Sequence, residues 1–95
     1  MPDTVSVSHN PTAGQFEIRT EQGMAFLRYA HDGPSLDLLH TEVPAELEGH
    51  GYGAALAKAA LDYAKDEGLG IIPTCPFITA YLRRHPKYAT LITTR

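Results

Sequence analysis

Apolar and polar residues alternate over much of the first half of the chain, and a period of two is typical of half-buried β-strands. Phe16 and Ile18 fall on one face of such a segment, whereas residues 24–31 are mostly apolar and suit a central strand. Clusters of turn-forming residues at 10–14, 21–23 and 32–34 separate the segments. The pattern predicts strands joined as antiparallel hairpins, at residues 5–8, 15–20, 24–31 and 36–43.

The fourth predicted strand carries candidate functional side chains. Since neighbouring residues on a strand point to opposite faces, strict alternation divides this strand into two sets. One face is expected to hold Leu36, Leu38, His40 and Glu42, and the other Leu39, Thr41 and Val43. Pro44 is expected to end the strand, because proline cannot donate a ladder hydrogen bond.

The second half of the chain changes to a helical period. Between Gly51 and Glu67, apolar residues recur at spacings of three and four, and charged residues occupy the opposite side. Gly68 suits the left-handed position that often follows a helix. The elements expected after it are a short apolar strand at 71–74, a helix at 76–85 and an extended segment at 88–92. Four strands, a helix, a strand and a helix indicate an α/β fold.

Composition narrows the class of protein. A chain of 95 residues that is 43% hydrophobic and 20% charged predicts a single globular domain, residues 1–95. No apolar run is long enough to span a membrane. The net charge of −3 argues against a nucleic-acid partner, which would need a basic excess. A single cysteine and the absence of a secretory leader favour a cytoplasmic location.

The segment with the clearest chemistry is the glycine-rich loop 48–54, which lies between the fourth predicted strand and the first helix. Glycines let a backbone come close to a bulky anion, and the first turn of a helix offers N–H groups that have no partner within the helix. The helix dipole adds partial positive charge at the same place. The loop therefore predicts a phosphate-binding site.

Two phosphate-binding motifs do not fit this loop. A P-loop needs Gly-Lys-Ser/Thr, whereas Gly53 is followed by Ala54 and Ala55. A dinucleotide fingerprint needs a carboxylate at the end of the next strand, and residues 73–75 supply none.

A third motif does fit. The run Glu48-Gly49-His50-Gly51-Tyr52-Gly53 resembles the pyrophosphate loop of the Gcn5-related N-acetyltransferases, whose pattern is Gln/Arg-x-x-Gly-x-Gly/Ala. The flanking segments His40–Val43, Pro73–Phe77 and Tyr81–Pro86 are similar to one small, single-domain branch of that family. The resemblance covers roughly residues 16–92. Glu48 departs from the pattern, which has Gln or Arg at this position. An acid near a pyrophosphate weakens binding unless it points to solvent.

The resemblance implies both a fold and a cofactor. Strands 36–43 and 71–74 would lie side by side and parallel, and would splay apart to admit the pantetheine arm of acetyl-CoA or coenzyme A. Pantetheine would follow Thr41 and Val43 like an added strand. The residues expected to meet phosphate are His50, Gly51, Tyr52, Gly53 and Ala54 through their backbone N–H groups, and Arg84 through its side chain.

Four residues are candidates for catalysis, and each has a structural alternative. Cys75 would lie near the thioester as a reactive thiol, or would simply be buried. His40 or Glu42 would act as the base that takes a proton from the amine, or the two would form a solvated pair. Tyr81 would be the acid that protonates the leaving thiolate, or would pack in the core.

The resemblance therefore implies an acetyl-CoA-dependent N-acetyltransferase that acts on a small-molecule or peptide amine. The alternatives are a non-catalytic CoA- or acyl-CoA-binding module and, less favoured, a protein-interaction domain. Members of the family with known acceptors carry extra helices between the first two strands and extra strands at the end, which shape the acceptor site. Here only a few turn residues join the first two strands, so the resemblance implies an acceptor site that is open or is completed by a protein partner. No His, Cys, Asp or Glu spacing suits a metal, and none is expected.

Overall fold

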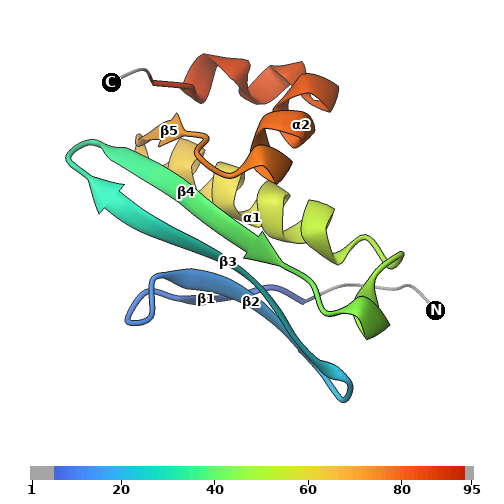
Figure 1. The fold of residues 1–95 in the computed structure, drawn as a ribbon. Coiled ribbons are helices and arrows are strands. Elements are labelled where there is room, and N and C mark those ends of the chain that lie inside the picture. Colours follow the sequence, from blue (N-terminus) through green and yellow to red (C-terminus); the bar gives the residue numbers. More distant parts are fainter. Residues whose placement is uncertain (1–5, 94–95) are drawn as a thin grey trace.

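The computed structural model describes residues 6–93, which contain a five-stranded sheet in the order β1-β2-β3-β4-β5 (Figure 1). The strands are β1 (Ser8–Asn10), β2 (Gln15–Thr20), β3 (Gly23–Asp32), β4 (Ser35–Glu42) and β5 (Gly70–Ile72). Neighbours from β1 to β4 are antiparallel, whereas β4 and β5 are parallel. The predicted α/β fold, with a mostly antiparallel sheet and one parallel pair, is confirmed.

Helical segments cover one face of this sheet (Figure 1). They are α1 (Tyr52–Glu67), α2 (Pro76–Arg84) and η2 (Pro86–Leu91), whereas η1 (Ala45–Leu47) follows the end of β4; η denotes a 3₁₀ helix. Helix α1 contacts β2, β3, β4 and β5, and α2 and η2 both contact α1. No helix in the described part of the chain is both long and apolar enough to cross a membrane.

The core fills the space between α1 and the sheet. Its largest fully buried side chains are Leu27, Leu36, Leu38, Leu56, Leu61, Ile71 and Ile78. Each such side chain contributes about 1.5–3 kcal/mol when it leaves water. Helix α1 ends before Gly68, where the N–H of Leu69 donates to the carbonyl of Ala64 at 2.8 Å and closes the last turn.

A β-bulge in β4 corrects one prediction. Leu38 pairs with Tyr29 and His40 pairs with Arg28, so Leu39 has no partner on β3. Tyr29 is buried under α1, whereas Arg28 points to the opposite face. His40 and Glu42 therefore do not share a face with Leu36 and Leu38, and strict alternation was wrong from Leu39 onward.

The outer face of the sheet is the one opposite α1. Along β2, β3 and β4 it carries Glu17, Phe26, Arg28, His40 and Glu42, which the strand register places side by side. Arg28, His40 and Glu42 are exposed. No helix covers this part of the sheet in Figure 1.

The two ends of the described chain differ from the prediction. The first strand was expected at 5–8, but β1 begins at Ser8, and Val5 lies outside the described residues. The last segment is not extended, because residues 86–91 form η2, and only Ile92 bridges to Ile71. Buried Tyr88 and half-buried Leu91 lie three residues apart, which suits the threefold period of a 3₁₀ helix.

Candidate functional site

The site begins where β4 and β5 separate. Their last ladder pair is Asp37 with Ile72, and the N–H of Cys75 then donates to the carbonyl of Leu38 at 2.8 Å. Strand β4 continues to Glu42 with no strand of the described chain on that side. The bulge at Leu39 lies at the same point. It helps β4 to turn away from β5, because a bulge bends its strand and increases the local twist. Residues 39–42 thus leave a strand edge open.

A cavity of about 580 Å³ lies beside this open edge. It is bounded by the end of β4, η1 and the following loop, the first turn of α1, and α2. The residues that line it are Thr41, Glu42, Val43, Leu47, Glu48, Gly49, Gly51, Tyr52, Gly53, Ala54, Phe77 and Arg84. Its size and its mixture of apolar walls with a few polar groups are typical of a site for a small molecule.

The glycine loop supplies hydrogen-bond donors at one end of the cavity. Gly49 and Gly51 have φ of +86° and +78°, in the left-handed region where residues with a Cβ are strained. Gly51 is the N-cap of α1, and no side chain among the described residues caps this end. The carbonyl of Gly51 accepts from the N–H of Ala55 at 3.0 Å, and the preceding amides are the donors that a helix N-terminus leaves open.

Helices α1 and α2 approach each other closely at the cavity wall. A Cβ built on Gly53 would lie 2.9 Å from the ring of Phe77, so only glycine fits here without displacing the ring. Phe77 nevertheless remains 41% exposed, which is unusual for so large an apolar side chain. Its free surface forms part of the cavity lining.

The charge of the cavity comes from three side chains. Arg84 is the one basic residue among the described residues that line it, and Glu42 and Glu48 are the acidic ones. Side-chain charge therefore does not favour an anion on balance. Attraction for phosphate would have to come from the helix amides and dipole together with Arg84.

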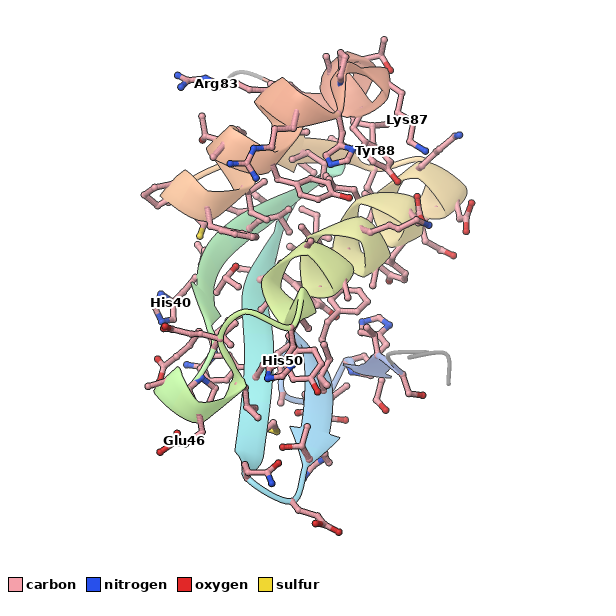
Figure 2. The ribbon with its side chains drawn as sticks, turned by 90° about the vertical axis from the view of Figure 1, so that its right-hand side faces the viewer. His40, Glu46, His50, Arg83, Lys87 and Tyr88 are labelled. Carbon is pink, nitrogen blue, oxygen red and sulfur yellow. The ribbon has the colours of Figure 1, made fainter. Side chains whose placement is uncertain are left out.

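The structure brings most of the predicted cofactor residues together. Seven line the same cavity: Thr41, Val43, Gly51, Tyr52, Gly53, Ala54 and Arg84. His50 does not line it, and its ring lies 5.7 Å from the ring of Tyr52 at the start of α1 (Figure 2). The binding role of each residue stays a prediction.

The predicted catalytic residues divide into three places. Cys75 is 4% exposed at the N-cap of α2, with its Sγ 3.6 Å from the Oγ1 of Thr41, so it lies directly behind the cavity wall. Glu42 lines the cavity, and its Oε1 lies 3.2 Å from the Nε2 of His40. Figure 2 shows His40 projecting from β4 away from α1.

Tyr81 lies apart from the cavity. Its ring stacks on His85 at 4.1 Å between ring centres, and the side chain is buried. Burial raises the pKa of its hydroxyl, Asp62 raises it further, and the charge of Lys58 opposes them. These neighbours lie on α1, which places Tyr81 between the two helices.

Sequence reasoning missed four residues of the cavity lining. Leu47 belongs to η1, a 3₁₀ turn that no pattern suggested, and Glu48 had been noted only as a departure from the loop pattern. Gly49 and Phe77 were quoted within motifs but were given no contact. The residues described by the structure contain no group of three or more His, Cys, Asp or Glu side chains placed to hold a metal ion.

Comparison with known proteins decides the family. A model of the GCN5-related N-acetyl-transferase family matches residues 15–91. The chain belongs to the GCN5-related N-acetyltransferase family. This confirms the resemblance that the glycine loop and its flanking segments carry.

Two vertebrate relatives and one solved structure extend this finding. Protein NATD1 of Homo sapiens is 38% identical over 85 residues, which cover 86% of this chain and 75% of that protein. Protein NATD1 of Xenopus tropicalis is 36% identical over 86 residues, covering 87% and 79%. The solution structure of a GCN5-like protein from Staphylococcus aureus superposes with a TM-score of 0.74 at 26% identity, over 96% of this chain and 90% of that one.

Proposed function

We propose that this GCN5-related N-acetyltransferase family member transfers an acetyl group from acetyl-CoA to an amine. The observation that carries the proposal is one cavity that joins the open donors of α1 to the unpaired edge of β4. A phosphate group and an amide-bearing arm suit these two surfaces respectively. Coenzyme A contains both, linked in one molecule.

The residues of the cavity fit that cofactor in parts. The amides at the start of α1 and the Arg84 side chain would hold the pyrophosphate. Thr41 and Val43 would pair with the amides of pantetheine as an added strand would. The apolar faces of Leu47 and Phe77 would cover its hydrocarbon portion.

The chemistry assigned to the chain is a proton transfer beside the thioester. Acetyl-CoA supplies the activated acetyl group, and the amine forms the new C–N bond as the C–S bond breaks. The amine must lose a proton, and Glu42 or His40 accepts it from the outer face. The departing sulfur must gain a proton, and Cys75 is the nearer candidate for supplying it, since Tyr81 lies apart from the cavity.

Calorimetry with acetyl-CoA, NAD and ATP tests the binding step. We expect acetyl-CoA to bind most tightly and Gly51→Glu to abolish binding, because the new side chain places bulk and negative charge at the donors. Gly33→Glu is the matched control, since Gly33 also has a positive φ, of +59°, with no atom within 4 Å of an added Cβ, in the β3–β4 turn. Tighter binding of NAD, or no binding of any of the three, would overturn the proposal.

Release of free thiol across a panel of amines tests the reaction. Turnover that falls in Glu42→Gln or in His40→Gln identifies the base. Acetyl-CoA binding without turnover on the whole panel would favour the non-catalytic CoA-binding module. A single acetyl mass added to the wild type and not to Cys75→Ser would indicate that Cys75 carries the acetyl group.

A further inference from the structure

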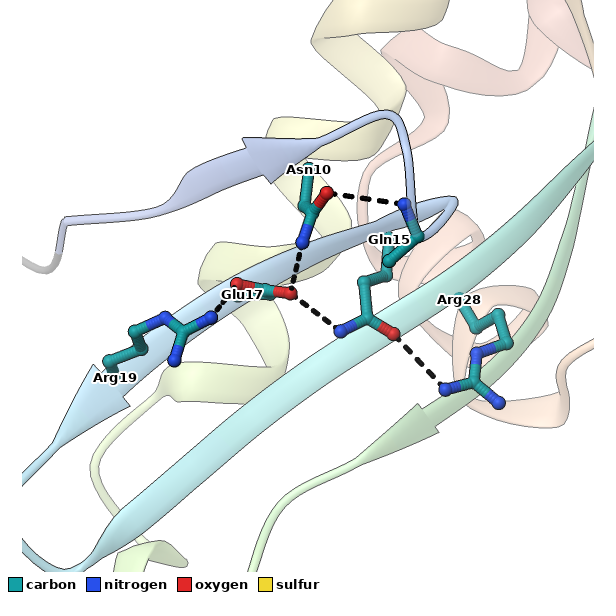
Figure 3. Close-up of polar contacts among 6 residues, drawn as sticks. Asn10, Gln15, Glu17, Arg19 and Arg28 are labelled. Carbon is teal, nitrogen blue, oxygen red and sulfur yellow. Dashed lines mark hydrogen bonds and ion pairs between the residues drawn. The ribbon is translucent and has the colours of Figure 1, made fainter.

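A buried carboxylate organises the outer face of the sheet. Glu17 is only 3% exposed, and its carboxylate accepts hydrogen bonds from Gln15 at 2.6 Å, Arg19 at 2.9 Å and Asn10 at 3.0 Å (Figure 3). The hydrogen bond from Gln15 is the main cause that lowers the pKa of Glu17, and that from Asn10 is the second. The network leaves the amide group of Gln15 in one orientation, because its nitrogen must face the carboxylate.

That orientation aims the amide oxygen of Gln15 at Arg28. The oxygen accepts from Nη2 of Arg28 at 3.2 Å, and the Cζ of Arg28 lies 5.2 Å from the centre of the Phe26 ring. A hydrogen bond and a cation–π contact thus hold a guanidinium group that is itself exposed. Among residues 6–93 Arg28 forms no ion pair, and most of its five N–H donors remain available.

The register of the sheet places this cation beside the candidate base. Arg28 lies opposite His40, and Phe26 lies opposite Glu42. Arg28 and Glu42 are therefore diagonal neighbours, about 7–8 Å apart between backbone positions, and long side chains span such a diagonal. Glu42 is also the point at which the outer face meets the cavity. A positive group thus lies on the strand next to Glu42, which itself lines the cavity.

We propose that the outer face around Arg28 is the acceptor site, and that the acceptor is a small amino acid whose carboxylate binds Arg28 while its amine faces Glu42. The guanidinium fork matches a carboxylate in two parallel hydrogen bonds. Arg28 does not line the cavity, which assigns it to the acceptor rather than to the phosphates of CoA. The inference rests on the proposed function and names its substrate class.

A pair of acceptors that differ only in the carboxylate tests the role of Arg28. Thiol release is measured with β-alanine and with β-alaninamide, as kcat/KM, for the wild type, Arg28→Gln, Arg28→Lys and Arg83→Gln. We expect the wild type to prefer β-alanine and Arg28→Gln to lose about 5–10-fold on β-alanine, with less than a twofold change on the amide. Arg28→Lys keeps the charge without the fork, and its kcat/KM on β-alanine is expected to lie between those of the wild type and Arg28→Gln.

Arg83 is the matched control, because it is an exposed arginine on α2 that projects away from the sheet (Figure 2). Its variant should behave as the wild type on both acceptors. Equal loss on both acceptors in Arg28→Gln, or no preference in the wild type, would overturn the inference. A lower affinity of Arg28→Gln for CoA alone would also overturn it, since Arg28 would then serve the cofactor.

A binding measurement keeps this inference separate from the proposed function. If no amine is acetylated, the proposed activity fails, and N-acetyl-β-alanine is titrated into the CoA-saturated protein while the Arg28 side-chain signals are followed by NMR. A shift that N-acetyl-β-alaninamide does not produce supports a carboxylate site at Arg28. The absence of such a shift overturns the site.

Discussion

The side chain of His9 joins the short edge strand β1 to the rest of the fold. Strand β1 is only 3 residues long, and His9 stacks on Phe16 with ring centres 4.3 Å apart and planes within 8°. Its edge meets Tyr63 at 4.6 Å, and its Nε2 lies 2.5 Å from the hydroxyl of Tyr29. Burial lowers the pKa of His9, and the nearby His31 lowers it further.

This lowered pKa predicts a loss of stability in weak acid. The folded chain binds the proton of His9 less readily than the unfolded chain, whose histidine titrates near its ordinary value of about 6.5. The stabilisation is therefore complete above that value and is lost as the pH falls through it toward the lower folded value. Urea unfolding at pH 7 and pH 5 should show a smaller decline in the free energy of unfolding for His9→Phe, which keeps the stacking and cannot titrate. Equal declines in both proteins would contradict the assignment.

At the scale of elements, a hydrogen bond joins η2 to α1. The hydroxyl of buried Tyr88 donates to Oδ1 of Asp62 at 2.6 Å, and Nζ of Lys58 donates to the other carboxylate oxygen at 2.8 Å. Burial raises the pKa of Tyr88, and the bond to Asp62 raises it further. Burial by itself would raise the pKa of Asp62, but the hydrogen bonds from Lys58 and Tyr88 and the charges of Lys58 and Lys87 together lower it.

We expect Tyr88→Phe to lower the free energy of unfolding by about 1–3 kcal/mol, since a bond to a charged, partly buried carboxylate is lost. The measurement is chemical denaturation. Tyr81→Phe is the control, because the hydroxyl of Tyr81 shows no hydrogen bond within the described chain, and its removal should cost less. If the two variants were equally destabilised, packing rather than the bond to Asp62 would hold η2 in place.

Most elements could be predicted from the sequence, because their causes are local. β2 was predicted at its observed bounds, and α1 and α2 to within a residue at each end, since period, glycine and proline positions act over a few residues. The bulge at Leu39 was missed, although the adjacent apolar residues Leu38 and Leu39 break the alternation. Such a pair does not show whether the extra residue of a bulge lies in this strand or in its partner.

The site was predictable to the same extent. The glycine loop is a local motif, and its position at the start of α1 followed from the sequence. The contact of Gly53 with Phe77 joins two helices through space, and no spacing along the chain reports it. The arrangement of Arg28 beside His40 likewise depends on the register of β3 with β4.

At the scale of the whole molecule, the cavity lies where β4, η1, α1 and α2 meet. A ligand in this place touches elements from both halves of the chain, which come together only in the folded state. Because the ligand binds the folded and not the unfolded chain, its binding stabilises the fold. Mass action then gives a magnitude, because acetyl-CoA at 100 times its dissociation constant stabilises the folded state by about 2.7 kcal/mol. For a domain of this size that corresponds to a rise in Tm of roughly 10–20 °C.

A thermal melt with and without acetyl-CoA checks this expectation in the wild type and in Arg84→Gln. Arg84 is the basic residue of the cavity lining, so its loss should weaken binding and shrink the rise in Tm at the same ligand concentration. The melting temperature without ligand should barely change, because Arg84 is exposed and forms no ion pair among residues 6–93. An unchanged rise in Arg84→Gln would place the phosphates away from α2 and leave the helix amides of α1 as their main ligand, whereas no rise in the wild type would remove this cavity as the acetyl-CoA site.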